Sequence, residues 1–141
     1  MKTWVIAIVA LLAAAAGGYY LYVQGSAPAD SAVVAEAKRG FAACTNPPNP
    51  APAPDGATAT KEQMLAARHA ASGFDTAIVA YTQCLKNVEQ RMHDGHEFSA
   101  TADIKQVAAL AVEKHNAAID RDQKFASQVN EEIRKFKTKG N

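Results

Sequence analysis

Apolar residues recur at alternating steps of three and four within residues 60–94, and this spacing restricts the fold more than any other feature. Nine positions follow it without a gap: Met64, Ala67, Ala71, Phe74, Ile78, Tyr81, Leu85, Val88 and Met92. A heptad pattern puts one apolar stripe along an α-helix, and that stripe needs a partner helix to bury it. Thr60 with Gln63 three residues later forms a capping box, which predicts where the helix begins.

The partner helix is predicted in residues 101–138, which carry a second long amphipathic pattern. Its apolar positions include Ile104, Val107, Ala111, Val112, Ala118, Phe125, Val129 and Ile133. Two such helices joined by a short loop form an antiparallel hairpin about 50 Å long. A shorter helix is predicted over residues 31–43, with an N-cap at Asp30 or Ser31. The fold class is therefore all-α.

Three polar residues of the second long helix need an interpretation. His115 and Asp122 fall on its apolar side, and we expect them to form a polar layer that fixes the register of the hairpin. Arg121 lies between Asp120 and Asp122, and we expect it to be an ordinary solvent-exposed charge.

Residues 45–59 cannot form a helix, because five prolines fall between Pro47 and Pro54. Asp55-Gly56 predicts a turn at the end of this segment. An extended chain from Cys44 to Thr60 reaches about 50 Å in the polyproline II conformation. The helix from Thr60 to Cys84 rises about 36 Å. The segment is therefore long enough to run antiparallel beside that helix.

A stripe of small residues offers a surface for the proline-rich segment. It lies next to the heptad positions and consists of Ala66, Ala70, Gly73, Ala77 and Ala80. Because none of these side chains is bulky, the extended backbone can approach closely. We expect the segment to pack along this stripe as a polyproline–helix hairpin. The alternative is a flexible proline-rich linker.

Cys44 and Cys84 are the two cysteines of the chain. An even pair in an exported protein predicts a disulfide. The bond would close a loop of about 40 residues, worth about 4 kcal/mol in the chain-entropy model. It would join the start of the proline-rich segment to the end of the small-residue stripe.

The first 23 residues are a separate segment. Residues 4–23 contain no charged side chain and are preceded by Lys2. Twenty such residues span about 30 Å as a helix, the thickness of a bilayer core. We expect a single-pass anchor in the bacterial inner membrane, with the N-terminus cytoplasmic and the C-terminal domain periplasmic. The alternative is a signal peptide whose cleavage releases the chain into the periplasm.

The predicted organisation follows directly. Residues 1–23 form the membrane anchor, residues 24–30 a linker, and residues 31–141 the exported domain. Within the domain we expect a short helix at 31–43, an extended segment at 45–59, and long helices at 60–94 and 101–138.

Composition and motifs exclude some classes of function. From Gln24 onward the chain carries 14 Lys and Arg against 14 Asp and Glu, so it lacks the positive charge of a nucleic-acid-binding protein. No set of acid, base and nucleophile can be assembled, which argues against an enzyme, and no cofactor motif is present. His93 and His96 are weak candidates for a metal site. The simpler interpretation is a polar helix end.

Three stretches together resemble a known group of proteins. They are the prolines that follow Cys44, Pro-Asp-Gly-Ala-Thr-Ala at 54–59, and Tyr-Thr-Gln-Cys-Leu at 81–85. The pattern is similar to that of small exported or membrane-anchored helical proteins of Gram-negative bacteria, mostly uncharacterised. The resemblance implies a disulfide-pinned helical domain outside the inner membrane, and it implies no activity.

The function we expect is that of a membrane-anchored accessory or scaffold protein that faces the periplasm. It would bind another envelope protein, or itself, through the helical hairpin. We expect part of the seam to stay exposed and to form the interaction surface, at Met64, Phe74, Ile78, Tyr81, Leu85 and Val88. The alternative is a soluble periplasmic protein that binds a metal ion or a small ligand.

Overall fold

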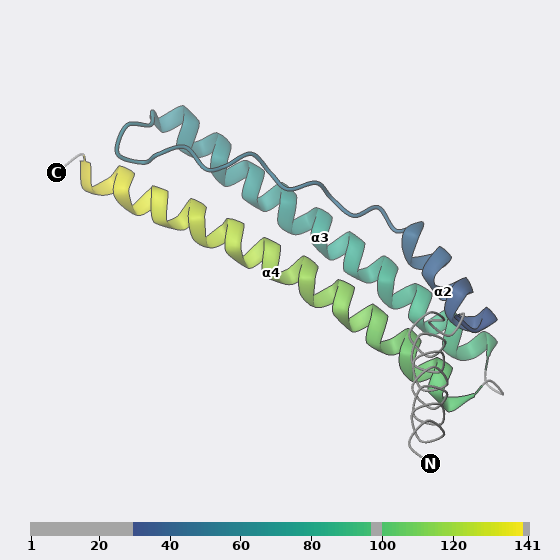
Figure 1. Cartoon of the computed structure of the whole chain (residues 1–141). Helices are drawn as coiled ribbons and strands as arrows, with labels where there is room; N and C mark the ends of the chain where they lie inside the picture. The colour runs from purple at the N-terminus through teal and green to yellow at the C-terminus, as the bar shows by residue number, and fades with distance from the viewer. Residues whose placement is uncertain (1–29, 97–99, 140–141) are drawn as a thin grey trace, which may run out of the picture. The chain divides into compact units, whose positions relative to one another are not determined.

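A computed structural model describes residues 30–96 and 100–139. Every regular element in these two ranges is an α-helix, which confirms the predicted fold class: α2 (Ala32–Ala42), α3 (Lys61–Gly95) and α4 (Thr101–Lys139). Figure 1 shows α3 and α4 side by side and antiparallel, with α2 against the end of the hairpin where α3 finishes. None of the described helices is apolar enough to cross a membrane. The predicted anchor at 4–23 lies outside the described residues.

The helix ends follow from local capping. The hydroxyl of Ser31 accepts a hydrogen bond from the backbone N–H of Val34 and begins α2. At the start of α3, Thr60 and Gln63 form the predicted capping box, each side chain accepting from the other residue's backbone N–H. The observed helices begin and end within one residue of the predicted ranges.

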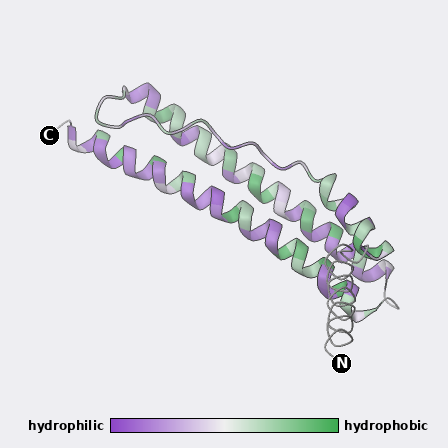
Figure 2. Cartoon of the chain, in the orientation of Figure 1, coloured by the Kyte–Doolittle hydropathy of each residue, from purple (hydrophilic) through white to green (hydrophobic). Residues whose placement is uncertain are grey.

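One hydrophobic core joins the three helices. From α2 it takes Val34, Ala37 and Phe41, which are at most 2% exposed, because α2 contacts both α3 and α4. The seam of α3 is buried in the same core. Figure 2 shows hydrophobic residues concentrated where α2 meets the hairpin, whereas the opposite end of α4 is mostly hydrophilic.

The expectation that part of the seam stays exposed is corrected by this packing. All six of the named seam side chains are buried, with exposed fractions from 1 to 6%: Met64, Phe74, Ile78, Tyr81, Leu85 and Val88. They are covered by α2, by α4 and by the proline-rich segment, so they hold this chain together.

The proline-rich segment runs from the end of α2 back along α3 to the start of α3, as Figure 1 shows. Its burial repeats every third residue. The buried or half-buried positions are Cys44, Pro47, Pro50, Ala53, Gly56 and Ala59, and almost every residue between them is exposed. Three residues per turn is the repeat of a polyproline II helix. One side of the segment therefore packs continuously against the hairpin.

The segment ends in a tight turn against α4. The backbone oxygen of Asp55 accepts hydrogen bonds from the N–H groups of Thr58 and Ala59. The N–H of Gly56 donates to the carboxylate of Glu132 at 2.8 Å. A Cβ atom at Gly56 would overlap the carbonyl group of Glu132. The backbone of the turn thus touches the backbone of α4, and only glycine leaves room for this approach.

We predict opposite effects for two alanine substitutions. Gly56→Ala should destabilise the chain by about 1–3 kcal/mol, because the added methyl must push the turn away from α4. Gly73→Ala is the matched control: Gly73 is exposed within α3, and a Cβ there would meet no atom within 4 Å. It should stabilise the chain by about 0.5–1 kcal/mol through helix propensity. Equilibrium unfolding measures both, and a Gly56→Ala variant as stable as the parent would contradict the described contact.

Candidate functional site

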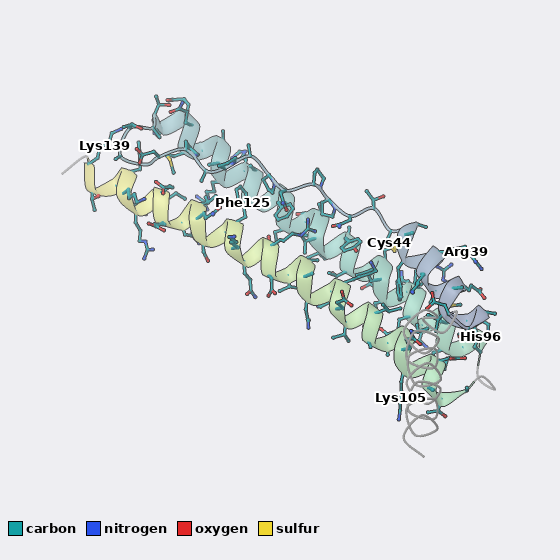
Figure 3. The ribbon with its side chains drawn as sticks, viewed as in Figure 1. Arg39, Cys44, His96, Lys105, Phe125 and Lys139 are labelled. Atoms are coloured by element: carbon teal, nitrogen blue, oxygen red, sulfur yellow. A yellow bond between two sulfur atoms is a disulfide. The ribbon has the colours of Figure 1, made fainter. Side chains whose placement is uncertain are left out.

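A disulfide fixes the start of the proline-rich segment. Cys44 and Cys84 are bonded as predicted, with their Cα atoms 5.8 Å apart. Cys44 follows directly on α2, and Figure 3 shows it at the junction between α2 and the segment. The bond therefore ties the end of α2 and the start of the segment to a point about two-thirds of the way along α3.

Arg121 of α4 holds the same part of the segment from the other side. Its guanidinium donates to the backbone oxygen of Pro47 at 3.1 Å and to the side-chain oxygens of Asn46 and Asn49. A guanidinium suits this role because its donors are held in a rigid, planar fork. The expectation that Arg121 is an ordinary surface charge is wrong. It connects α4 to the extended segment. A polyproline II helix forms no internal hydrogen bonds, so the backbone of the segment needs partners such as Arg121.

An aromatic pair lies beneath this contact. The rings of Phe74 and Phe125 meet edge to face, with centroids 5.9 Å apart, and Phe125 lies between α4 and α3 in Figure 3. The guanidinium of Arg121 also lies 5.9 Å from the Phe74 ring centroid, which adds a cation–π contact. The packed Phe74 and Phe125 rings and the hydrogen bonds of Arg121 therefore occur at the same level of the hairpin.

Charged side chains of α4 hold the far end of the segment. Lys139 donates to the backbone oxygen of Ala59 at 2.7 Å, beside the turn in Figure 3. Hydrogen bonds from Lys135 and from the Gly56 N–H lower the pKa of Glu132. Glu132 is thus held in its ionised form, which accepts the Gly56 hydrogen bond. Because the pKa of Glu132 is lowered in the folded chain, its hydrogen bonds stabilise the fold at neutral pH. This stabilisation is lost as the pH falls through the folded pKa.

The proline-rich segment contacts the small-residue stripe only at the end of the stripe near Cys84. Ala77, Ala80 and Cys84 line a shallow hollow together with Thr45 and Pro47. Ala66, Ala70 and Gly73 are exposed, and the space beside Gly73 is open. The prediction that the segment packs along the whole stripe is therefore corrected. Contacts from Arg121, Glu132 and Lys139 draw the segment toward α4, into one groove of the α3–α4 hairpin.

We predict that Arg121→Ala weakens the fold by about 1–3 kcal/mol, since three hydrogen bonds to a charged group are lost. It should also expose residues 45–54 to protease. Arg121→Lys should recover only part of the loss, because an ammonium cannot reproduce the fork. Lys114→Ala removes the same charge from an exposed site of α4 two turns earlier and should be close to neutral. Equal proteolysis of Arg121→Ala and Lys114→Ala would show that Arg121 does not hold the segment.

The two histidines suggested as weak metal ligands have different partners. His96 lies 3.2 Å from the carboxylate of Glu36 and links the end of α3 to α2. His93 lies 3.4 Å from its neighbour Asp94. No group of three or more His, Cys, Asp and Glu side chains suited to a metal ion occurs within residues 30–96 and 100–139. The role that the structure gives His96 is this contact with Glu36 of α2.

The predicted polar layer of His115 and Asp122 does not form. His115 is exposed on α4, whereas Asp122 is half-buried. Burial raises the pKa of Asp122, and so do the charge and hydrogen bonding of Asp75 on α3. Asp122 therefore faces a second carboxyl group, that of Asp75, across the hairpin, and His115 takes no part in this contact.

The other groove between α3 and α4 is open. Two hollows of about 230 and 220 Å³ follow it and share Lys86 and Glu89 on α3. Both are lined only by α3 and α4, and their apolar residues are Leu85, Ile104, Val107, Ala108, Ala111 and Val112. Val112 is 54% exposed. The hairpin thus has one groove filled by α2 and the segment, and a second, which we call the open groove, filled by neither.

No protein-family model matches the chain, and neither a curated protein nor a solved structure matches it.

Proposed function

We propose that the chain is a membrane-anchored accessory protein that faces the periplasm and binds another envelope protein in the open groove. The observation that carries the proposal is the asymmetry of the hairpin. One groove is closed by residues of the same chain, whereas the open groove exposes Val112 beside the buried side chain of Leu85. An apolar floor next to solvent on a folded surface is a typical protein-binding site.

The shape and chemistry of the open groove suit an amphipathic helix. Such a helix could place apolar side chains against Leu85, Ile104 and Val112. The groove is bordered by Lys86 and Glu89 on α3 and by His115 and Asn116 on α4. These polar groups would contact the polar flanks of the bound helix, and the mixture of charges would select its register.

The N-terminal segment supports the membrane part of the proposal. Residues 4–23 have the length and composition of a membrane-spanning helix. The disulfide between Cys44 and Cys84 is typical of proteins in oxidising compartments such as the periplasm. The resemblance to small exported proteins of Gram-negative bacteria points to the same location.

A photo-crosslinking experiment in intact cells tests the proposal. A photoreactive amino acid in place of Asn116, at the edge of the open groove, should form a product in the membrane fraction with one other envelope protein. Adding Val112→Glu should reduce that product by about tenfold or more, since a buried charge opposes docking on an apolar surface. The thermal unfolding of the chain should not change, because Val112 is half-exposed.

Two controls make the result specific. The photoreactive residue at Lys114, exposed on α4 one heptad before Arg121 and thus on the side of the proline-rich segment, should give no such product. Leu65→Glu, at an exposed site of α3 about 30 Å before Lys86, should leave the Asn116 product unchanged. A product that survives Val112→Glu, or that consists of two copies of this chain, would contradict the proposed binding.

A further inference from the structure

The first half of α3 carries an exposed apolar line outside the hollows of the open groove, on the same side of the helix as Lys86 and one to three heptads before it. Three large apolar side chains are exposed in the described part of the chain, and two of them lie here: Leu65 is 47% exposed and Val79 57%. They are two heptads apart, so they lie on one side of the helix, about 21 Å from each other. Ser72 lies midway between them and is also exposed.

A row of small residues lies about 100° around α3 from this line. Ala66, Gly73 and Ala80 are exposed one residue after Leu65, Ser72 and Val79. No neighbouring atom would meet a Cβ placed at Gly73. Beyond His69 and Thr76, which lie between this row and the Leu65–Val79 line, the surface of α3 therefore carries no bulky side chain.

The charges on this part of α3 are few and are arranged around the same midpoint. Between Gln63 and Leu85, the helix carries only Arg68 and Asp75 among its Lys, Arg, Asp and Glu residues. Both are exposed and one heptad apart, on the flank of the Leu65–Val79 line. Arg68 precedes Ser72 by four residues, and Asp75 follows it by three. The positive and negative charges are thus nearly equidistant from Ser72.

We infer that this face binds a second copy of the chain, with the two α3 helices antiparallel and a two-fold axis near Ser72. Residues before Ser72 then lie opposite residues that are, to within one position, equally far after it in the other copy. Leu65 packs against Val79 of the second copy, and Arg68 lies opposite its Asp75. The two-fold axis generates each of these contacts twice.

Charge complementarity selects this arrangement over the parallel one. In a parallel pair Arg68 would oppose Arg68 and Asp75 would oppose Asp75, which is unfavourable at both positions. In the antiparallel pair the incoming Arg68 also approaches the place where Asp75 faces Asp122 across the hairpin. Asp75 contributes to the raised pKa of Asp122, and a cation there would offset the repulsion between the two carboxyl groups.

The contact is small, since it uses one side of about four helical turns. Specific interfaces of this size are at the weak end of the range. We expect the copies to exchange in solution and to associate more strongly when anchored in one membrane, because anchoring raises their effective concentration.

Cysteine crosslinking of the full chain in its native membrane tests this inference. The disulfide occupies both natural cysteines, so one introduced thiol is the only free one. With a short bismaleimide, Ser72→Cys should crosslink to itself. Leu65→Cys and Val79→Cys should each crosslink poorly alone, since like positions are about 21 Å apart in the antiparallel pair. Co-expressed, they should crosslink to each other. Lys114→Cys, exposed on the segment side of α4, is the control.

The charge pair has its own readout. Adding Arg68→Asp should reduce the Ser72→Cys product about tenfold or more, and Arg68→Asp combined with Asp75→Arg should restore it, because the exchanged charges remain complementary. A Ser72→Cys product no stronger than that of Lys114→Cys would overturn the inference. A self-crosslink of Leu65→Cys as strong as that of Ser72→Cys, or no rescue by the exchange, would do the same. The Asn116 photo-crosslink tests the open groove separately, because the α3 lining of that groove begins only at Thr82.

Discussion

The contact between an extended segment and two helices determines the rest of this structure. A two-helix hairpin buries only the side on which its helices meet, and the seam of α3 needs cover on a further side. The segment supplies that cover through every third residue from Cys44 to Ala59. Its polyproline repeat matches the groove because each turn presents one small or prolyl side chain to the core. An extended chain makes no internal hydrogen bonds, so Arg121 and Lys139 of α4 donate to its carbonyl groups.

The same contact makes the two sides of the hairpin different. The disulfide and α2 close one groove near the end of α3, and the turn at Gly56 closes it near the start. The second groove has no such cover from the described segments, and its floor reaches solvent at Val112. The proposed partner helix would pack into the open groove, as the segment packs into the groove on the other side of the hairpin. In the first half of α3, Leu65 and Val79 stay exposed for the proposed contact with a second copy.

The elements that depend on local sequence could be predicted, whereas those that depend on distant contacts could not. Heptad spacing gave the buried seam of α3, Thr60 and Gln63 gave its first turn, and the cysteine pair gave the disulfide. Arg121 could not be identified, because it lies between two aspartates like a surface residue and its acceptors are 72 to 75 positions away. The small-residue stripe allowed close approach, but it contained no signal that α4 would draw the segment away from Gly73. The open groove is visible only once the segment has been placed.

The most direct test of the central claim is a distance distribution between the segment and α4. Spin labels on Ala51→Cys and Ser127→Cys, both exposed positions, can be measured by pulsed electron paramagnetic resonance with the native disulfide intact. A segment held in the groove predicts a single narrow distribution, which should broaden when Arg121→Ala is added. A broad distribution in the otherwise unaltered chain, like that of a tethered flexible linker, would contradict the account.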